Sequence, residues 1–400
     1  MSDLSQPIAP ASPATDARHP RRTLILAGIA HALHDGYTDL IYVLLPVWRT
    51  EFALSYGALA IVRGLYTGTM AALQIPSGRM GERFGGRMVL ALGTAVSALG
   101  YALAGLSGGL IGLCVALAIG GAGASTQHPI ASAAVTRAYR GAARGPLGVY
   151  NFTGDLGKAI LPAATSVLLT SLTWRYTVSM LAAVGLCVAV LIALVMPRIG
   201  HGAATAKRSV VHQGGGRGGF PLLLAIGILD SGVRMGLLTF LPFLLRGKGA
   251  SLPDIGFALS LVFVGGAAGK FACGWLGARF GVLWTVILTE GGTALAILGI
   301  LALPLLPAMI LLPALGIMLN GTSSALYGTV PELAPAHRTE RAFALFYTGT
   351  IGSGALSPVF FGLLGDATGI AWATVATAIT ATMTIPLAVA LDRRAHLGAI

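Results

Sequence analysis

The sequence predicts an all-α polytopic membrane protein in which twelve membrane-crossing helices form two six-helix bundles related by internal duplication. Three observations predict this fold: the composition, the length of the apolar segments and a repeat within the chain. Hydrophobic residues make up 55% of the 400 residues and charged residues only 10%. Because a soluble domain carries about 25% charged residues, this composition excludes a soluble enzyme, a disordered chain and a secreted disulfide scaffold.

Twelve apolar segments follow one another along the chain, and a segment of about 20 residues can cross a hydrocarbon core about 30 Å thick. We expect one bundle over 24–196 and a second over 220–391, joined by a polar, Gly-containing linker at 197–219. Residues 1–23 and 392–400 are expected to be cytoplasmic tails, the first of them disordered. The predicted spans are 24–47, 57–77, 88–107, 109–136, 146–171, 174–196, 220–245, 254–275, 282–303, 305–330, 342–364 and 369–391.

Lys and Arg are distributed unequally between the two sides of the predicted bundles. Eighteen lie on the side of the termini and four on the opposite side. Because cytoplasmic segments are enriched in Lys and Arg, both termini and the linker are predicted to be cytoplasmic, with the protein in the cell inner membrane. The same distribution accounts for the net charge of +12 without a nucleic-acid partner.

The cysteines and the Gly-rich segments show no pattern typical of a metal or nucleotide site. Cys114, Cys187 and Cys273 lie inside apolar segments, with no metal-ligand or disulfide spacing. The Gly-rich segment 120–123 lies within a span, and no Lys-Ser or Lys-Thr pair follows it. We therefore expect no metal and no cofactor, with energy taken from a proton gradient or from the substrate gradient itself.

The internal repeat rests on three landmarks that share one offset. Segments 78–85 and 274–281 match at five of eight positions, at an offset of 196. Asp35 corresponds to Asp230 at an offset of 195, and Gly154 corresponds to Gly349 at the same offset. Two parallel six-span halves predict a secondary transporter whose substrate site lies between the halves near the midplane.

These residues resemble the major facilitator superfamily over essentially all of 24–391. The loop 78–87 resembles the signature between the second and third helices of that family, with Glu82 in place of the usual aspartate and Ala278 at the acid's position in the second copy. The resemblance implies a gating role for this loop and a cavity surrounded by helices 1, 4, 7 and 10. The implied gating residues are Gly78, Glu82, Arg83, Gly85 and Arg87.

Within that superfamily the chain resembles the fosmidomycin-resistance-type efflux proteins. The resemblance rests on His34-Asp35 in the first span and on segment 121–129 in the fourth. The fifth span, with Gly154, Gly157 and Pro162, resembles the antiporter signature but lacks its Gly-Pro pair. These resemblances imply export by antiport.

Nine formally charged residues fall within the predicted spans. Each unpaired charge at a helix centre costs about 2.5–3.5 kcal/mol, and nine of them would together exceed the net stability of most folds. They must therefore pair with one another or line water inside the bundle. They are Asp35, Asp39, Arg63, Asp155, Lys158, Asp230, Arg234, Lys270 and Glu290.

Helical spacing shows which of these residues share a face. His31, Asp35 and Asp39 form one stripe at i, i+4 and i+8. Asp155 with Lys158, and Asp230 with Arg234, are each close enough on one helix to form an inert local ion pair, and a functional role is the open alternative. For Arg63, inward and outward orientations are both open. Glu290 lies on an outer helix of the implied fold, where we expect a packing or interfacial role.

Two sets of candidate site residues follow. A carboxylate in a low-dielectric interior can exchange a proton near neutrality, as can imidazoles, so the proton-coupling candidates are Asp35, Asp39, His34 and Asp230. The remaining polar and aromatic residues of the central helices are expected to bind substrate. These candidates are His31, Tyr42, Gln74, Gln127, His128, Tyr150, Asn151, Asp155, Lys158, Arg234, Lys270, Asn320, Tyr327 and Tyr347.

The sequence thus predicts a proton-coupled transporter of a small molecule, with efflux by antiport as the leading hypothesis. The basic residues Arg63, Lys158, Arg234 and Lys270 favour an anionic substrate, and proton-coupled uptake of a small organic anion is the alternative. A membrane-embedded enzyme is disfavoured because no second cluster completes a metal or nucleophile site around His31 and His34. The expected partners are the substrate, protons and the lipid bilayer, with the protein a monomer.

Overall fold

The computed structural model describes residues 19–139, 142–198, 219–334 and 339–397. Most of the predicted N-terminal tail and linker, at 1–18 and 199–218, therefore lie outside the described residues, as do the last three residues of the chain. Throughout the described ranges the regular secondary structure is helical.

The first half contains seven helices. Three of the six predicted spans are longer in the structure than in the sequence prediction, and one is broken into two helices. The helices are α1 (Pro20–Glu51), α2 (Tyr56–Phe84), α3 (Gly86–Leu106), α4 (Leu110–Ala124), α5 (Gln127–Tyr139), α6 (Arg144–Leu168) and α7 (Trp174–Val195).

The second half contains six helices, of which one makes two crossings. Helix α9 is interrupted at Gly281, whose φ of 77° is outside the helical region. The helices are α8 (Gly219–Gly247), α9 (Leu252–Ala302), α10 (Leu305–Leu333), α11 (Thr339–Thr368), α12 (Ile370–Thr382) and α13 (Thr384–Leu397).

Twelve crossings are accounted for within the described ranges. Nine helical stretches are long and apolar enough to cross a membrane, with α4–α5 and α12–α13 each counted as one stretch and α9 as two. The other three long helices are α1, α6 and α11, with 32, 25 and 30 residues. At 1.5 Å per residue, each exceeds the thickness of a hydrocarbon core of about 30 Å. The predicted all-α, twelve-helix fold is confirmed.

Several helix boundaries differ from the predicted ones. Helix α1 begins at Pro20, so that the last four residues of the predicted tail are helical, because proline is well accommodated in the first turn. Helix α13 continues to Leu397, beyond the predicted end at 391. The predicted span 109–136 is broken at Ser125–Thr126, just before Pro129, whose missing N–H cannot continue the ladder.

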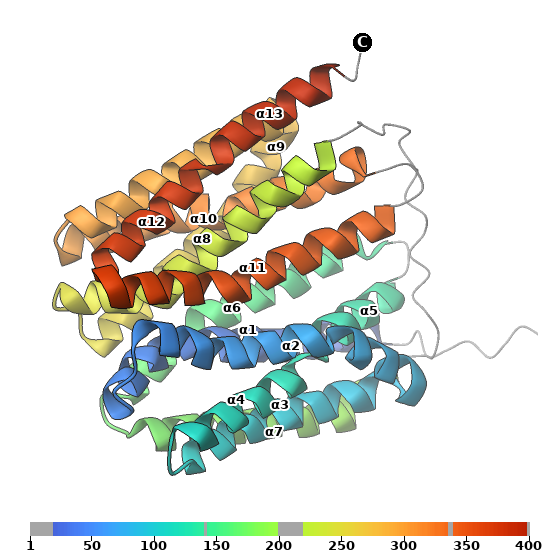
Figure 1. The fold of residues 1–400 in the computed structure, drawn as a ribbon. Coiled ribbons are helices and arrows are strands. Elements are labelled where there is room, and N and C mark those ends of the chain that lie inside the picture. The colour runs from blue at the N-terminus through green and yellow to red at the C-terminus, as the bar shows by residue number, and fades with distance from the viewer. Residues whose placement is uncertain (1–18, 140–141, 199–218, 335–338, 398–400) are drawn as a thin grey trace, which may run out of the picture.

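The two halves lie against each other along α2 and α11, and they diverge toward the right in Figure 1. Helix α1 begins and α13 ends at that side, which we call the terminal end, and the opposite side is the far end. The apolar core follows this arrangement. One cluster joins both halves through residues such as Leu44 and Trp48 of α1 and Leu241 of α8.

At the terminal end each half has a core of its own. The first half packs around Leu26 and Ile192, and the second half around Leu223 and Val330. The halves are therefore held together by apolar packing at the far end and in the middle. Nearer the terminal end, the buried apolar residues that the structure describes form one cluster within each half.

Candidate functional site

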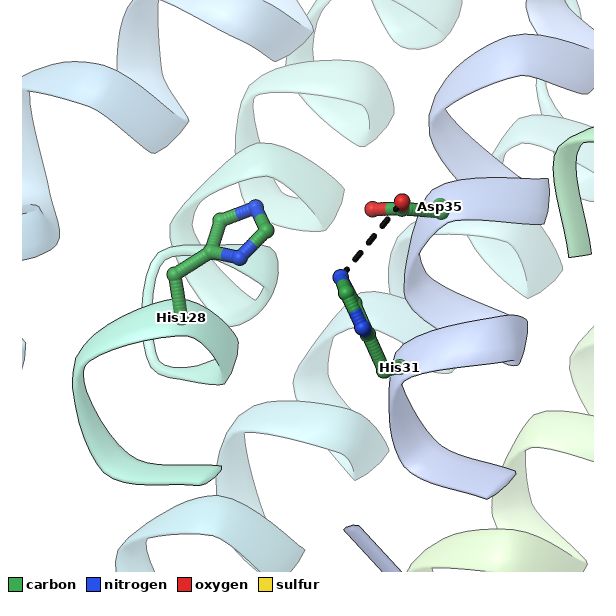
Figure 2. A group of neighbouring side chains, drawn as sticks. All are labelled: His31, Asp35 and His128. Carbon is green, nitrogen blue, oxygen red and sulfur yellow. Dashed lines mark ion pairs between the residues drawn. The ribbon is translucent and has the colours of Figure 1, made fainter. Parts of the chain in front are cut away.

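The candidate site of the first half centres on the carboxyl group of Asp35, which is buried in α1. His31 Nε2 lies 3.4 Å from Asp35 Oδ2, and Lys158 Nζ of α6 lies 3.3 Å from the same oxygen. His34 Nε2 lies 3.9 Å from Oδ1. Figure 2 shows His128 of α5 facing the same group from the opposite side, with its ring centroid 4.8 Å from that of His34.

Glycines in α6 create the space that this cluster occupies. A Cβ at Gly154 would lie 2.6 Å from Asp35 Oδ2 and from His31 Cε1. A Cβ at Gly157 would lie 1.9 Å from the backbone oxygen of Ala32. Small residues thus allow α6 to approach α1 closely, and the acid and imidazole fill the space that a side chain would take.

The hydrogen bond of His31 places a proton requirement on this cluster. His31 Nδ1 lies 2.8 Å from the carbonyl oxygen of Tyr150, which can only accept, so Nδ1 donates. The other ring nitrogen then faces Asp35 Oδ2. Contact between a lone pair and a carboxylate is repulsive, so the pair is stable when one proton lies between Nε2 and Oδ2.

The same cluster resembles a metal site in composition, and its charges argue against one. Ligand atoms of His31, Asp35 and His128 lie within 4.8 Å of one another. The ammonium group of Lys158 already neutralises the Asp35 carboxylate at 3.3 Å. A divalent cation would have to bind beside that positive charge, so these residues fit a proton better than a metal.

Asp155 and Lys158 are paired differently from the local ion pair that their spacing allowed. Lys158 contacts Asp35 of α1, whereas Asp155 accepts two hydrogen bonds from Lys270 of α9, at 2.6 and 2.8 Å. Helix α6 lies between α1 and α9, so each side chain has a closer partner on a neighbouring helix. Asp155 and Lys270 link the two halves.

Arg63 points inward, which decides between the two orientations left open by the sequence. Its Nη2 donates to Tyr42 Oη at 2.5 Å, and its guanidinium carbon lies 4.5 Å from the centroid of the Tyr42 ring. Both residues also contact Met235 Sδ of α8 at 3.6 Å. Arg63 is therefore buried where the halves meet. Sequence reasoning missed Met235 as a site residue, because its hydrophobicity does not distinguish it from other apolar residues of the span.

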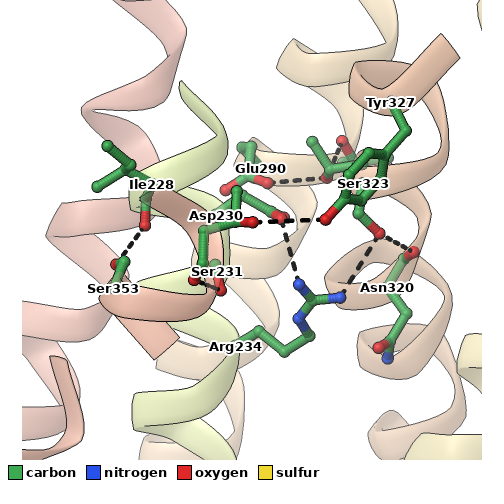
Figure 3. Close-up of polar contacts among 12 residues, drawn as sticks. Ile228, Asp230, Ser231, Arg234, Glu290, Asn320, Ser323, Tyr327 and Ser353 are labelled. Carbon is green, nitrogen blue, oxygen red and sulfur yellow. Dashed lines mark hydrogen bonds and ion pairs between the residues drawn. The ribbon is translucent and has the colours of Figure 1, made fainter. Parts of the chain in front are cut away.

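The candidate site of the second half contains Glu290, for which the sequence predicted a packing or interfacial role. The Glu290 side chain is buried in α9, and its carboxyl group is a neighbour of that of Asp230 on α8 (Figure 3). Thr322 Oγ1 lies 2.8 Å from Glu290 Oε1, and Arg234 Nη2 lies 3.7 Å from Asp230 Oδ2 (Figure 3). Gly281 separates this part of α9 from its first crossing.

The other predicted substrate-binding residues are divided between buried and exposed positions. Gln127 and Tyr150 are buried beside the Asp35 cluster, and Asp39 is buried one turn further along α1. Gln74 and Asn320 are half-buried, and the rings of Tyr327 and Tyr347 pack at a tilt with centroids 4.9 Å apart. Asn151 is exposed. Asn320 borders the cluster of the second half, because its carbonyl oxygen accepts from Ser323 Oγ, the hydroxyl that Arg234 reaches (Figure 3).

The predicted gating loop 78–87 is almost entirely helical, which corrects the expectation of a loop. Helix α2 continues to Phe84, and only Gly85, with a φ of 91°, separates it from α3. Glycine tolerates this backbone conformation, so one residue suffices for the turn. Glu82 and Arg83 are exposed on the last turn of α2, and Arg87 Nη1 donates to the Met196 carbonyl at 3.3 Å.

Comparison with known proteins places this architecture in a family. The family model described as Major Facilitator Superfamily matches residues 27–217 and 223–398. The chain is 24% identical over 157 residues to "Uncharacterized MFS-type transporter Rv1250" of Mycobacterium tuberculosis, covering 39% of this chain and 27% of that protein. It is 29% identical over 168 residues to "Probable sulfoacetate transporter SauU" of Cupriavidus necator, covering 41% of this chain and 39% of that protein.

The similarity to these relatives thus spans well under half of their length. Among solved structures, the fold matches a bacterial homolog to the human lysosomal transporter Spinster in its inward-facing, occupied conformation. The TM-score is 0.78 at 17% identity, over 92% of this chain and 96% of that chain. The unoccupied inward-facing form gives a TM-score of 0.77 at 17% identity, over 95% and 98%.

Proposed function

Because this chain belongs to the Major Facilitator Superfamily, we propose that it is a proton-coupled secondary transporter that moves a small molecule across the cell inner membrane. The family and the two relatives named as transporters support transport and not enzymatic activity. The contact between His31 and Asp35 carries the proposal of proton coupling, since one proton is needed between Nε2 and Oδ2.

Alternating access follows from the distribution of the apolar core. The halves share a core at the far end and have separate cores at the terminal end. With the termini in the cytoplasm, as the Lys and Arg distribution predicts, this arrangement is an inward-facing state. Rocking of residues 24–196 against 220–391 would then expose the central residues to the other side.

Coupling requires that the proton and the substrate favour different facings, since a ligand shifts populations only through differential affinity. Transfer of the shared proton from His31 Nε2 to Asp35 Oδ2 removes the negative charge that holds Lys158 at 3.3 Å. Lys158, whose side chain is 30% exposed, is then free to contact an anionic or polar substrate. The resemblance to fosmidomycin-resistance-type efflux proteins supports export by antiport as the leading direction.

Uptake of a small organic anion together with protons is the second candidate. The name of the SauU relative concerns sulfoacetate, a small organic anion. In this chain Arg63, Lys158, Arg234 and Lys270 converge on the middle of the molecule from both halves. These four cations support an anionic substrate in either direction of transport, and we propose that the protein functions as a monomer.

The direction and the coupling are tested with purified protein in liposomes. A thermal-shift screen over compound classes, with phosphonates and sulfonates included, first identifies a ligand. A pH gradient of either sign is then imposed and the movement of that compound is followed. Antiport predicts substrate movement opposite to the proton gradient, and symport predicts movement along it. Flux that is independent of the gradient in both orientations would refute proton coupling.

A further inference from the structure

We propose that Asp230 and Glu290 share one bound proton, which makes this carboxyl pair a second proton-binding site, in the half of the protein opposite Asp35. Asp230 lies on α8 and Glu290 on α9, and their carboxyl groups are neighbours in Figure 3. Both side chains are almost fully buried, at 3% and 1% exposure. Two ionised carboxylates buried next to each other would repel, and neither could donate a hydrogen bond to the other.

The hydrogen-bond donors around Glu290 also require a proton. Glu290 Oε2 is buried and has no donor among the other described residues. Thr322 Oγ1 donates its one hydrogen to Glu290 Oε1 at 2.8 Å, so Oε2 is the oxygen that lacks a donor. The proton shared with Asp230 supplies the donor that Oε2 lacks.

The charge balance gives the same number of protons. Arg234 Nη2 of α8 lies 3.7 Å from Asp230 Oδ2. Among the described residues, Arg234 and Glu290 are the two charged side chains that interact with Asp230. From α10 the neighbours are hydroxyl groups, and the nearby phenol of Tyr327 is directed to Thr350 Oγ1 at 3.4 Å. Two carboxylates and one guanidinium would leave a buried net charge of −1, which is costly. One proton neutralises the group.

Arg234 controls the occupancy of this site. Its side chain is 18% exposed, more than either acid, and its Nη1 reaches Ser323 Oγ at 3.5 Å (Figure 3). While Arg234 contacts Asp230, one proton suffices. If the guanidinium moves away, the pair takes a second proton from a hydronium ion and leaves a water molecule. The role of this step in transport rests on the proposed function, whereas the shared proton is a property of the resting protein.

Infrared spectroscopy of the purified protein in lipid nanodiscs tests the shared proton directly. A protonated carboxyl has a C=O band separate from that of a carboxylate, and this band shifts in D2O. We expect Glu290→Gln to lose the band of one carboxyl group, because Asp230 then ionises beside Arg234. Asp230→Asn should lose the same band for the same reason, and Arg234→Gln should gain one. The exposed residue Glu332 on α10 provides the control, and Glu332→Gln should leave the band unchanged.

A variant with no change in charge guards against misfolding of these proteins. Thr322→Val removes the hydroxyl beside Glu290 Oε1, so the carboxyl band should keep its area and move to higher frequency. A wild-type band in Glu290→Gln or an unmoved band in Thr322→Val would overturn the proposal. The infrared experiment measures no flux, so its result is independent of the transport assay. Absence of proton-driven transport in liposomes would refute the proposed function but not the shared proton. An unchanged infrared band would refute the shared proton but not the proposed function.

Discussion

Lys270 of the second half donates hydrogen bonds to both carboxylate oxygens of Asp155 in the first half, at 2.6 and 2.8 Å. This bidentate contact joins α6 and α9 across the interface between the halves. The side chain of Lys270 is 39% exposed and that of Asp155 is 11% exposed, so solvent screens the pair in part. The pair belongs to the present arrangement of the halves and must break or rearrange when they move.

Replacing Lys270 with alanine should favour the alternative arrangement of the two halves. A partly exposed ion pair contributes about 1 kcal/mol, which corresponds to a roughly fivefold shift in population. Distances between spin labels on the two halves measure this shift, and the charge exchange D155K/K270D should reverse it. Glu51→Ala breaks the 2.8 Å pair with Arg175 inside the first half and should leave the distances unchanged.

Replacing Asp35 with asparagine should abolish proton-driven transport without unfolding the protein. Asparagine keeps the size of the side chain but cannot bind or release the proton between His31 and this position. Substrate exchange at equal pH on both sides should persist, because it needs no net proton movement. Proteoliposome flux with and without a pH gradient checks both points, with Asp254→Asn at the far end as the control. Wild-type coupling in Asp35→Asn would remove this residue from the mechanism.

Replacing Arg234 with alanine should lower the affinity for an anionic substrate more than the affinity for a neutral one. A hydrogen bond to a charged group is worth about 1.5–3 kcal/mol, so the anion should lose about tenfold or more in affinity. Thermal-shift titrations of a matched anionic and neutral ligand provide the comparison. An equal loss for both ligands would indicate that Arg234 acts only as the structural partner of Asp230.

The far end is closed in part by Asp366 of α11, which lies beyond the predicted span 342–364. Asp366 Oδ1 accepts from the backbone N–H of Tyr56 at 2.7 Å, and Oδ2 accepts from that of Gly57 at 2.9 Å. These N–H groups begin α2 and have no partner within that helix. A carboxylate of the second half therefore caps a helix of the first half, where the helix dipole also favours negative charge.

Replacing Asp366 with alanine should increase the population of the open far end about fivefold, because the contact at this exposed site contributes about 1 kcal/mol to closure. Labelling of a cysteine placed beneath this contact measures the opening. Asp254→Ala is the matched control, because Asp254 caps its own helix through Ser251 and does not cross between the halves. Equal labelling in the two variants would show that the Asp366 contact does not hold the far end closed.

The same contact predicts how closure depends on pH. Partial burial raises the pKa of Asp366, but the hydrogen bonds from Gly57, Ser55 and Tyr56 outweigh it, so the pKa lies below its ordinary value of 3.8. A carboxyl group whose pKa is lowered in the closed state stabilises that state fully at pH values above the ordinary pKa of the group. This stabilisation is lost as the pH falls through the lowered pKa. The contribution of Asp366 to closure should therefore be constant between about pH 5 and 8. A change in wild-type closure within that range that is absent in Asp366→Ala would contradict this.

The close approach of α6 to α1 predicts a large effect of a single methyl group. Gly157→Ala would place a Cβ 1.9 Å from the Ala32 carbonyl oxygen, a backbone atom that cannot rotate away. Overpacking of this kind costs about 1–3 kcal/mol, so the unfolding temperature in detergent should fall. Gly148→Ala on the same helix meets nothing within 4 Å and should be neutral or stabilising. Similar unfolding temperatures for both variants would refute the packing argument.

Much of the fold was predictable because its signals are local in the sequence. Each crossing depends on about 20 consecutive apolar residues, and the duplication follows from residue matches such as Asp35 with Asp230. The stripe of His31, Asp35 and Asp39 follows from helical periodicity alone. Helix ends were less predictable, as at Ser125–Thr126, because breaks depend on hydrogen bonds and neighbouring helices.

The sequence by itself determined that this is a duplicated, twelve-helix membrane protein and that the nine charges within its spans must lie inside the bundles, because burying an unpaired charge in lipid is costly. Only the tertiary structure decided which charges meet. Lys158 contacts Asp35, Lys270 contacts Asp155, and Glu290 contacts Asp230. The reason is physical: attraction between charges depends on distance in space, and that distance is set by how helices far apart in the chain pack together.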